Sequence, residues 1–323
     1  MAVRDELIAL LSARKGEYLS GEEIADSLGC TRGAVWKAVT SLRSEGYKIS
    51  AVTNKGYRLE ASDVLSKESV EKYLTGSEWL DITVYKSTDS TNTRLRELAE
   101  KGAPEGTVVM AGMQTGGKGR MGRSFFSPDD TGLYLSILVR PDMTADNAVR
   151  MTTAAAVAVA EAAEEVSARR ADIKWVNDVY MDGLKICGIL TEASFNPESG
   201  GLEYAVVGIG INVYEPDGGF PQELKGIAGA VLDEHGEDHR SRMAALVISG
   251  FMRYYRELAQ NTFLDSYRRR LIWKNEKINL ISGNVMTPAT LIDVDEGCRL
   301  IAELENGERR TVSSGEISIR KQK

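Results

Sequence analysis

The sequence predicts an α+β protein of three domains: a winged helix-turn-helix, a larger α/β domain and a small C-terminal β-barrel. Its 323 residues are about twice the ~150 that typify one domain. Helical spacing of apolar residues extends to about residue 60, mixed strand and helix patterns follow, and short strands fill the last fifty residues or so. We therefore expect domains at residues 1–62, 66–271 and 272–323.

The first domain is predicted to contain three helices and a two-stranded wing. Glycine at position 29 permits a tight turn before the third helix, and the hydroxyl of Thr31 can cap that helix. The polar face of the third helix includes Arg43, and residues 47–49 and 57–59 form the wing. Three apolar stripes mark the helices: Leu7, Leu10 and Leu11; Ile24, Ala25 and Leu28; Val35, Val39 and Leu42.

This arrangement favours DNA binding, because cations and hydroxyls on one helix face can meet phosphates and base edges. Residues 1–60 carry nine basic and eight acidic side chains, so binding depends on how a charge of only +1 is distributed. A three-helix module that binds a protein is the alternative. The candidate DNA-binding residues are Thr31, Arg32, Lys37, Thr40 and Lys55.

After a predicted linker at residues 61–66, strands and helices mix in one domain. Strands are expected at residues 83–85, 107–110, 133–139 and 202–213, and helices at 93–101, 145–168, 241–260 and 263–270. Residues 173–192 are predicted to form a hairpin that turns at Asp182 and Gly183. From about residue 273, short strands with turns at 282–284 and 306–307 predict the small barrel.

Composition indicates a soluble cytoplasmic protein. No apolar stretch approaches the roughly 18 residues that cross a bilayer, and the N-terminus does not resemble a signal peptide. The isolated cysteines Cys30, Cys187 and Cys298 fit a reducing compartment. With 40 Lys and Arg against 47 Asp and Glu, the net charge of −7 would repel an anion, which therefore needs a local cationic patch.

Residues 116–123, Gly-Gly-Lys-Gly-Arg-Met-Gly-Arg, interleave four glycines with three cations. Glycine lets backbone amides approach an anion, and the cations neutralise it, so phosphate is the natural guest. A flexible loop that touches nucleic acid, or nothing, is equally compatible with this string. We expect the loop to be mobile until a ligand orders it.

A second cluster contains Lys174, Asn177 and Asp178, with Lys185 on a returning strand. Strand alternation predicts that Lys185 shares an apolar face with Cys187 and Ile189. A buried ammonium group needs an anion. An internal pair with Asp178 and a ligand carboxylate or phosphate are the two interpretations.

Two further strings have both structural and functional interpretations. Residues 89–92, Asp-Ser-Thr-Asn, open a helix and could merely cap it. Gly208 and Gly210 lie in a predicted strand, where a close approach of backbone or ligand explains glycine. The only two histidines, His235 and His239, do not predict a metal site, so no metal is expected from protein ligands alone and catalysis should be electrostatic.

Taken in order, these strings resemble the biotin protein ligases, and the helix-turn-helix resembles that of the bifunctional type that also represses the biotin operon. The resemblance implies a class II synthetase-like α/β ligase domain and an SH3-like C-terminal barrel. It implies that ATP and biotin form biotinyl-5′-AMP with Mg²⁺, and that the biotinyl group passes to a lysine of biotin carboxyl carrier protein. It further implies operator DNA as a partner and a homodimer promoted by biotinyl-5′-AMP, which acts as corepressor.

The resemblance also assigns roles to residues of this chain. Lys185 and Arg120 are the implied catalytic residues, and Mg²⁺ is expected near Asp178 and the phosphates. The implied biotin-binding residues are Ser90, Thr91, Asn92, Gln114, Gly117, Arg120 and Lys185. The implied adenylate-binding residues are Lys118, Gly119, Arg123, Phe125, Asn177, Asp178 and Asn212.

The glycine-cation string departs from the family's common pattern, which often reads Gly-Arg-Gly-Arg-Arg-Gly-Arg. Lys118 and Met121 replace arginines, which weakens bidentate phosphate contacts. Phe125 stands where many members have tryptophan, which changes stacking near the adenine. These departures affect rates and affinities rather than the reaction.

Three other functions are compatible with parts of the sequence. A non-catalytic winged-helix regulator could sense biotin or a related acid, although sensing a carboxylate does not require so many cations. A lipoate or octanoate ligase could share the central fold, although the glycine-cation loop and the C-terminal domain favour biotin. A ligase could also keep the helix-turn-helix without repressing.

Overall fold

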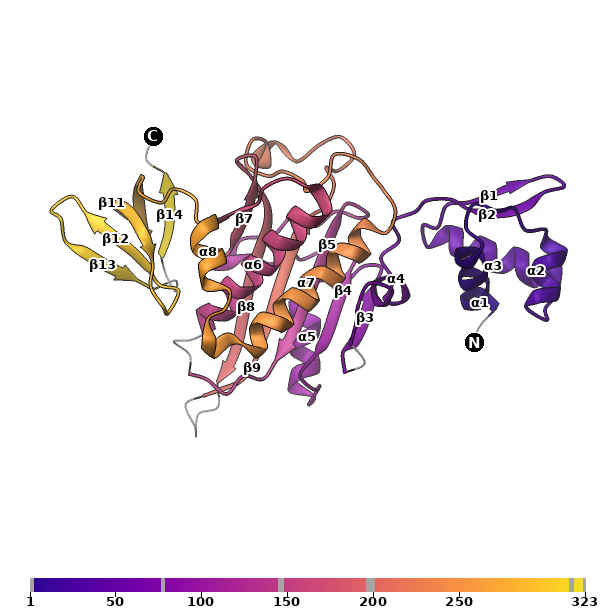
Figure 1. The fold of residues 1–323 in the computed structure, drawn as a ribbon, viewed down its shortest axis with the longest axis horizontal. Helices are drawn as coiled ribbons and strands as arrows, with labels where there is room; N and C mark the ends of the chain where they lie inside the picture. The colour runs from indigo at the N-terminus through magenta and orange to yellow at the C-terminus, as the bar shows by residue number, and fades with distance from the viewer. Residues whose placement is uncertain (1–2, 77–78, 145–147, 196–200, 314–316, 322–323) are drawn as a thin grey trace.

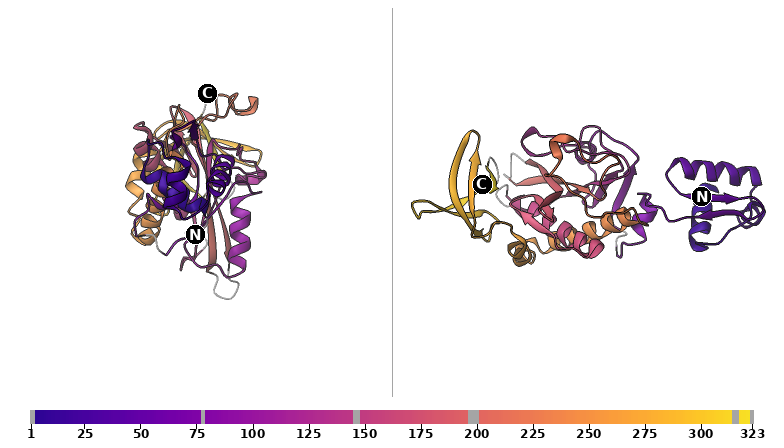
Figure 2. Two further views of the ribbon diagram at one scale, coloured as in Figure 1. Left: turned by 90° about the vertical axis from the view of Figure 1, so that its right-hand side faces the viewer. Right: turned by 90° about the horizontal axis from the view of Figure 1, so that it is seen from above.

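The protein has three folded units arranged in a row in the computed structural model (Figure 1). The structure describes residues 3–76, 79–144, 148–195, 201–313 and 317–321. The N-terminal helices lie at one end, a seven-stranded sheet lies in the middle, and a five-stranded sheet lies at the other end, as the second view also shows (Figure 2). The predicted α+β class and order of domains are confirmed.

The N-terminal unit contains the three predicted helices and the wing. The helices are α1 (Val3–Ala13), α2 (Gly21–Ser27) and α3 (Arg32–Ser44), followed by the antiparallel strands β1 (Ile49–Val52) and β2 (Gly56–Leu59). Thr31 caps α3, since its hydroxyl oxygen accepts a hydrogen bond from the Ala34 amide at 3.2 Å. The predicted apolar stripes form one core that includes Leu7, Ile24, Val35 and Leu42.

The segment between β2 and α4 (Lys67–Glu71) was predicted as a linker, and the structure shows it docked on the central domain. Ser62 is buried, and its carbonyl accepts from the Asp238 amide at 3.2 Å. Asp63 is 5% exposed and pairs with Arg240, whose side chain is 4% exposed. The hydroxyl of Tyr214 also donates to Asp63, at 2.6 Å. This segment therefore attaches the N-terminal unit to the core of the central domain.

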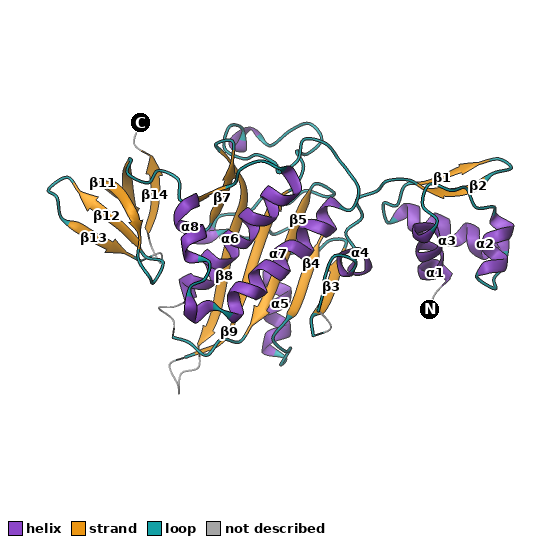
Figure 3. Cartoon of the chain, in the orientation of Figure 1, coloured by secondary structure: helices purple, strands orange, loops and turns teal. Residues whose placement is uncertain are grey.

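The central sheet has the strand order β3-β4-β5-β9-β8-β7-β6, and only β3 and β4 pair in parallel. Two long helices, α6 (Ala148–Ser167) and α7 (His239–Arg256), cover one face, and α5 (Thr91–Glu100) covers part of the other (Figure 3). No described helix is both long enough and apolar enough to cross a bilayer. The strands are β3 (Asp81–Tyr85), β4 (Thr107–Ala111), β5 (Gly132–Val139), β6 (Asp172–Lys174), β7 (Asp178–Met181), β8 (Leu184–Phe195) and β9 (Leu202–Asn212).

Alternation along β9 shows which side chains face which layer. Ala205, Val207 and Ile209 belong to the large core shared with α6 and α7. Tyr204 and Val206 pack instead with α5. Gly208 and Gly210 lie on the same face of β9 as Tyr204 and Val206, next to the start of α5. Because they are glycines, no bulky side chain of β9 fills the space there.

The C-terminal unit is a five-stranded antiparallel sheet in the order β13-β12-β11-β10-β14. It follows α8 (Leu264–Arg270) and joins the central domain through buried contacts. The Trp175 indole donates to the Cys298 carbonyl of this unit at 3.1 Å. Next to that contact, the Tyr267 hydroxyl on α8 donates to the Val176 carbonyl at 3.3 Å, which holds α8 beside the same segment of the central domain. The strands are β10 (Lys277–Ser282), β11 (Val285–Val294), β12 (Leu300–Leu304), β13 (Arg309–Val312) and β14 (Ile317–Lys321).

Candidate active site and nucleic-acid interface

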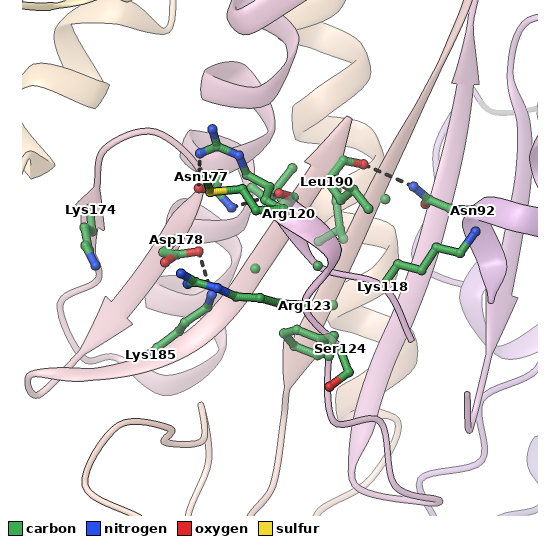
Figure 4. Close-up of a pocket in the computed structure, with 18 of the residues that line it drawn as sticks. Asn92, Lys118, Arg120, Arg123, Ser124, Lys174, Asn177, Asp178, Lys185 and Leu190 are labelled. Atoms are coloured by element: carbon green, nitrogen blue, oxygen red, sulfur yellow. Dashed lines mark hydrogen bonds and ion pairs between the residues drawn. The ribbon is translucent and has the colours of Figure 1, made fainter. Parts of the chain in front are cut away.

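A cavity of about 170 Å³ lies on the α5 face of the central sheet, where α5 begins and the glycines of β8 and β9 leave space. Figure 4 shows side chains from several segments converging on it. The lining residues come from the start of α5, residues 114–125, 174–178, 185–190 and 208–210, and strand β14. The predicted clusters therefore meet in one place, although they are far apart in the chain.

The helix-opening string lines the cavity and does not act as an ordinary cap. Ser90 occupies the N-cap position of α5 without a side-chain capping bond. The Oε1 atom of Gln114 takes that role, accepting from the Thr91 amide at 2.8 Å and from the Thr91 hydroxyl at 3.1 Å. The buried hydroxyl of Ser90 is thus not used to cap the helix that it begins.

Asn92 is held by bonds at both ends of its amide. Its Nδ2 donates to the Leu190 carbonyl at 3.2 Å and to Glu192 at 2.7 Å, while its Oδ1 accepts from the Ser136 hydroxyl at 2.6 Å. A Cβ atom on Gly208 would lie 1.9 Å from the Asn92 Oδ1 atom. Residue 208 must therefore be glycine because the Asn92 side chain occupies the space that a Cβ atom would fill.

The glycine-cation loop lies across the cavity. Arg120 is half-buried and donates to the Oδ1 atom of Asn177 at 3.0 Å. Burial lowers the pKa of the Arg120 guanidinium below its usual value. Met121 adopts a left-handed conformation with φ 56°, which sets the turn between Arg120 and Arg123. Lys118 and Arg123 also line the cavity, from the two limbs of the loop (Figure 4).

Phe125 packs on the glycine surface of the sheet. A Cβ atom added to Gly188 would lie 3.2 Å from the Phe125 ring, and one added to Gly210 would lie 2.6 Å from it. The predicted close approach at these strand glycines is present, and aromatic and amide side chains of the protein make it.

Lys185 forms the predicted internal pair and also lines the cavity. Its Nζ atom lies 2.6 Å from Asp178 Oδ1, and the side chains remain 28% and 18% exposed. The structure therefore shows the internal pair and leaves part of Lys185 facing the cavity. In Figure 4, Arg123 lies beside this pair.

The predicted face of Lys185 is wrong. The register with β7 shifts, so that Val179 faces Cys187 and Tyr180 faces Lys185, which leaves Ile186 unopposed. This bulge reverses the alternation. Cys187 and Ile189 belong to the core, whereas Lys185 points to the cavity side, where a Cβ on Gly188 would lie 3.2 Å from its Nζ atom.

Two predicted ligand residues do not line the cavity. Asn212 is buried and donates to the Gly229 carbonyl at 3.1 Å, so it holds the segment after β9. Gly117 packs against the segment that contains Phe125 and Ser127, where a Cβ would lie 2.4 Å from the Phe125 carbonyl oxygen. Gly119, by contrast, is among the lining residues.

Several lining residues had no predicted role, and Ile319, Arg320 and Lys174 are among them. Ile319 and Arg320 come from β14 of the C-terminal unit, which sequence analysis had no means of placing near position 120. Lys174 was noted but given no role; its Nζ lies 5.3 Å from the Trp273 ring centroid. Burial lowers the pKa of Lys174, and the nearby cations Lys185, Arg320 and Arg123 lower it further.

The charge of the cavity is strongly one-sided. Its lining includes a single carboxylate, Asp178, and six cationic side chains: Lys118, Arg120, Arg123, Lys174, Lys185 and Arg320. No group of three or more potential metal ligands occurs among the described residues. His235 stacks on Tyr214 with ring centroids 3.9 Å apart. The six cations make the lining of this cavity complementary to a polyanion.

Most acidic side chains of the N-terminal unit form ion pairs with arginines that lie outside α3, so they do not neutralise the cations of that helix. Arg4 pairs with Asp5 and Glu45, Arg14 with Glu17 and Glu23, and Arg58 with Glu60. Within the described residues, the exposed cations Arg32, Lys37 and Lys55 have no acidic partner.

Three polar residues on this helix instead have bonds within the protein. Thr31 caps α3, and the Thr40 hydroxyl donates to the Trp36 carbonyl at 2.9 Å. Arg43 donates to the Ile49 carbonyl at 2.9 and 2.6 Å, which ties α3 to the wing. Arg43 is exposed, in agreement with its predicted place on the polar face, but its guanidinium already bonds to the protein.

Comparisons with known proteins agree with this geometry. Family models match residues 3–58 (HTH domain), 84–212 (Biotin/lipoate A/B protein ligase family) and 275–320 (Biotin protein ligase C terminal domain). The chain is 35% identical to the bifunctional ligase/repressor BirA of Bacillus subtilis, covering 97% of both chains. It is 30% identical to the Escherichia coli BirA, covering 98% of this chain and 96% of that one.

The chain belongs to the BirA family of bifunctional ligase/repressors. Part of this chain also resembles solved structures. The biotin protein ligase from Aquifex aeolicus, solved in complex with biotin and ATP, matches with a TM-score of 0.63 and 27% identity. The match covers 75% of this chain and 99% of that chain. The resemblance inferred from the sequence is confirmed, and this BirA-family protein is a biotin protein ligase.

Family membership also decides between the alternatives. The model that matches residues 84–212 describes both biotin and lipoate ligases, whereas the model that matches residues 275–320 describes biotin protein ligases alone. Neither that activity nor a non-catalytic sensor is favoured.

Proposed function

We propose that this ligase joins biotin to ATP in the cavity described above, and that it transfers the biotinyl group to a lysine of biotin carboxyl carrier protein. The observation that carries this proposal is the set of six cations and one carboxylate beside a polar end formed by Ser90, Thr91 and Gln114. The cations suit a nucleotide triphosphate, and the polar end suits the ureido ring of biotin.

The first step needs positioning and charge neutralisation rather than a strong base. The biotin carboxylate is ionised at neutral pH, so its oxygen attacks the α-phosphorus and forms the mixed anhydride. The bond from the α-phosphorus to the bridging oxygen breaks, and pyrophosphate leaves with that electron pair. Lys185 lies where it can stabilise the charge that develops on the α-phosphate, and Arg120, Arg123 and Lys118 enclose the adenylate.

In the second step the amine of the acceptor lysine attacks the biotinyl carbonyl carbon. An amide bond forms, AMP leaves, and the amine gives its proton to solvent. The loop from Gly116 to Arg123 protects the mixed anhydride until the acceptor arrives.

Mg²⁺ fits this site as an ion carried by the nucleotide. A single carboxylate, Asp178, already paired with Lys185, matches an ion that keeps most of its ligands from phosphates and water. Asp178 and Asn177 are the residues that would approach it. When bound, it supplies neutralisation of the triphosphate charge.

We further propose that the protein represses transcription as a homodimer that biotinyl-5′-AMP promotes. Two copies are needed to place two α3 helices on neighbouring half-sites. Strand β7 pairs with β8 as far as Gly188, and Asn177 bonds to both the amide and the carbonyl of Ile189. Beyond it, residues 190–195 have β9 on one side and no described strand on the other. This free edge is available for pairing with a second copy.

Two experiments test these proposals. Intact-mass measurement of a carrier domain incubated with ATP, Mg²⁺, biotin and the enzyme should show one added biotinyl group, and octanoate in place of biotin should give none. Operator binding should tighten with biotinyl-5′-AMP and with protein concentration, and weaken with salt. Deleting residues 1–60 should abolish DNA binding and leave a folded ligase; DNA binding that survives the deletion contradicts the repressor proposal.

A further inference from the structure

The recognition helix α3 carries an exposed tryptophan on its outer face. Trp36 is 60% exposed, whereas the apolar residues Val35, Val39 and Leu42 of the same helix are buried. Isolated exposed apolar side chains are common on protein surfaces. Exposure alone therefore assigns no role, and the surroundings of the indole decide whether it has one.

Trp36 lies at the centre of the cationic face. Arg32 is one helical turn before it, Lys37 follows it directly, and Thr40 is one turn after it. Arg32 and Lys37 are exposed, and no described acid pairs with either. A surface with an aromatic group between unpaired cations is complementary to DNA, in which apolar base edges lie between phosphate rows.

The other groups on this face are either charged or already bonded. The hydroxyls of Thr31 and Thr40 bond to the backbone of α3, and Arg43 bonds to β1. Arg32 and Lys37 suit phosphates, and phosphate contacts fix register without reading sequence. On the outer face of α3, Trp36 remains as the large side chain able to make an apolar contact to a base.

Gly33 leaves space beside the indole, three residues before Trp36 on the same face. A Cβ atom at this position would contact only the Thr31 hydroxyl oxygen, at 3.8 Å, within 4 Å. The protein itself therefore tolerates alanine here, and glycine in a helix is less stable than alanine. A close approach from outside the molecule explains why glycine is present.

We propose that Trp36 determines sequence specificity by packing against the C5 methyl group of thymine in the major groove, with Gly33 allowing α3 to approach the base edges. This inference rests on the proposed operator binding. It separates two roles on one helix: Arg32 and Lys37 hold the DNA backbone, and Trp36 reads the base.

The test uses the full chain with biotin, ATP and Mg²⁺, and duplexes selected by the wild-type protein from a random-sequence pool. Each thymine of the selected site is replaced in turn by uracil, which removes only the methyl group. We expect at least one replacement to weaken wild-type binding by about fivefold to tenfold. Trp36→Ala should bind the thymine and uracil sites equally. Gly33→Ala should weaken binding to the selected site while the circular dichroism spectrum stays unchanged.

Lys37→Ala is the matched control. It should weaken binding to all sequences alike and reduce the slope of log K against log salt by about one, whereas Trp36→Ala should leave that slope unchanged. If the wild-type protein selects no sequence, the proposed operator binding is wrong. If it selects one, and Trp36→Ala retains the wild-type thymine preference or loses salt slope as Lys37→Ala does, the assignment of Trp36 is overturned.

Discussion

The carboxylate of Asp63, in the segment that joins the DNA-binding unit to the ligase domain, pairs with the guanidinium of Arg240 at the start of α7, and both side chains are about 95% buried. Asp63 also accepts from the Arg240 amide at 3.0 Å and from the Tyr214 hydroxyl. Arg240 has a second carboxylate partner, Asp130, whose side chain is 76% exposed. One guanidinium thus has a buried and an exposed partner.

These two partners give a matched pair of variants. Removing one member of a buried pair leaves an uncompensated charge, so Asp63→Ala should lower the free energy of unfolding by about 3–5 kcal/mol. Asp130→Ala should cost less than about 1 kcal/mol, because solvent screens an exposed pair. Urea unfolding measures both effects. Equal effects of the two variants would show that the segment is not held through Asp63.

Lys185→Ala should reduce adenylate formation far more than it weakens biotin binding. Loss of one electrostatic donor at a developing charge typically lowers the rate by about tenfold to a thousandfold. Biotin-dependent pyrophosphate exchange measures the rate, and calorimetry measures biotin affinity. Lys274→Ala is the control, since Lys274 makes an ion pair of the same length with Asp293 away from the cavity. Near-normal adenylation by Lys185→Ala would leave its pair with Asp178 a purely structural role.

Arg120→Gly should release biotinyl-5′-AMP early. The variant loses the hydrogen bond to Asn177 and a half-buried cation, so the loop encloses the adenylate less well. Biotin on lysines of bystander proteins, detected with streptavidin, reports this release. Met121→Gly is the control, because glycine adopts the left-handed φ of 56° without steric cost. Tight retention of the adenylate by Arg120→Gly would contradict the proposed enclosure.

Gly208→Ala should lower the melting temperature and disturb the biotin end of the cavity. The new methyl group would lie 1.9 Å from the Asn92 Oδ1 atom, and overpacking of this kind typically costs about 1–3 kcal/mol. Gly21→Ala, where the closest atom is 3.7 Å away, should have no such effect. In Gly208→Ala combined with Asn92→Ala, the costs should be less than additive. Strict additivity would show that Asn92 does not limit the space at residue 208.

Lys174→Met should raise the free energy of unfolding at neutral pH and weaken ATP binding. Because the pKa of Lys174 is lower in the folded protein, the unfolded chain binds more protons as pH approaches that pKa, and stability rises with pH there. The advantage of the variant should therefore shrink as pH rises towards the usual lysine range. Unfolding curves collected across that range check the sign. An advantage that grows with pH would contradict burial as the cause.

The sequence predicted where the helices, strands and residue clusters lie better than it predicted which way individual side chains point. Helix periodicity and turn residues located α3, the wing and the turn at Asp182 and Gly183. The face of Lys185 was missed because a bulge interrupts the twofold alternation on which the prediction depends. A bulge has no reliable signature in one sequence, since it depends on how two strands pair.

Other differences have the same physical origin. Thr40 and Arg43 lie on the exposed face as predicted, but the sequence did not indicate that nearby backbone carbonyls accept hydrogen bonds from their side chains. Arg320 reaches the cavity because the C-terminal sheet docks through the contact of Cys298 with Trp175, which joins distant segments of the chain. Local pattern cannot encode these relationships, which arise from tertiary packing.

The contribution of Arg320 affects how the C-terminal sheet can be treated in protein engineering. Lys174 and Arg320 approach one cavity from two folded units, so a nucleotide bound there would tie those units together and stabilise their contact by mass action. Exchanging this sheet between relatives would exchange part of the nucleotide site with it. A chimaeric ligase would therefore inherit its nucleotide affinity from both parents, and the sheet and the strand carrying Lys174 must be transplanted as one piece.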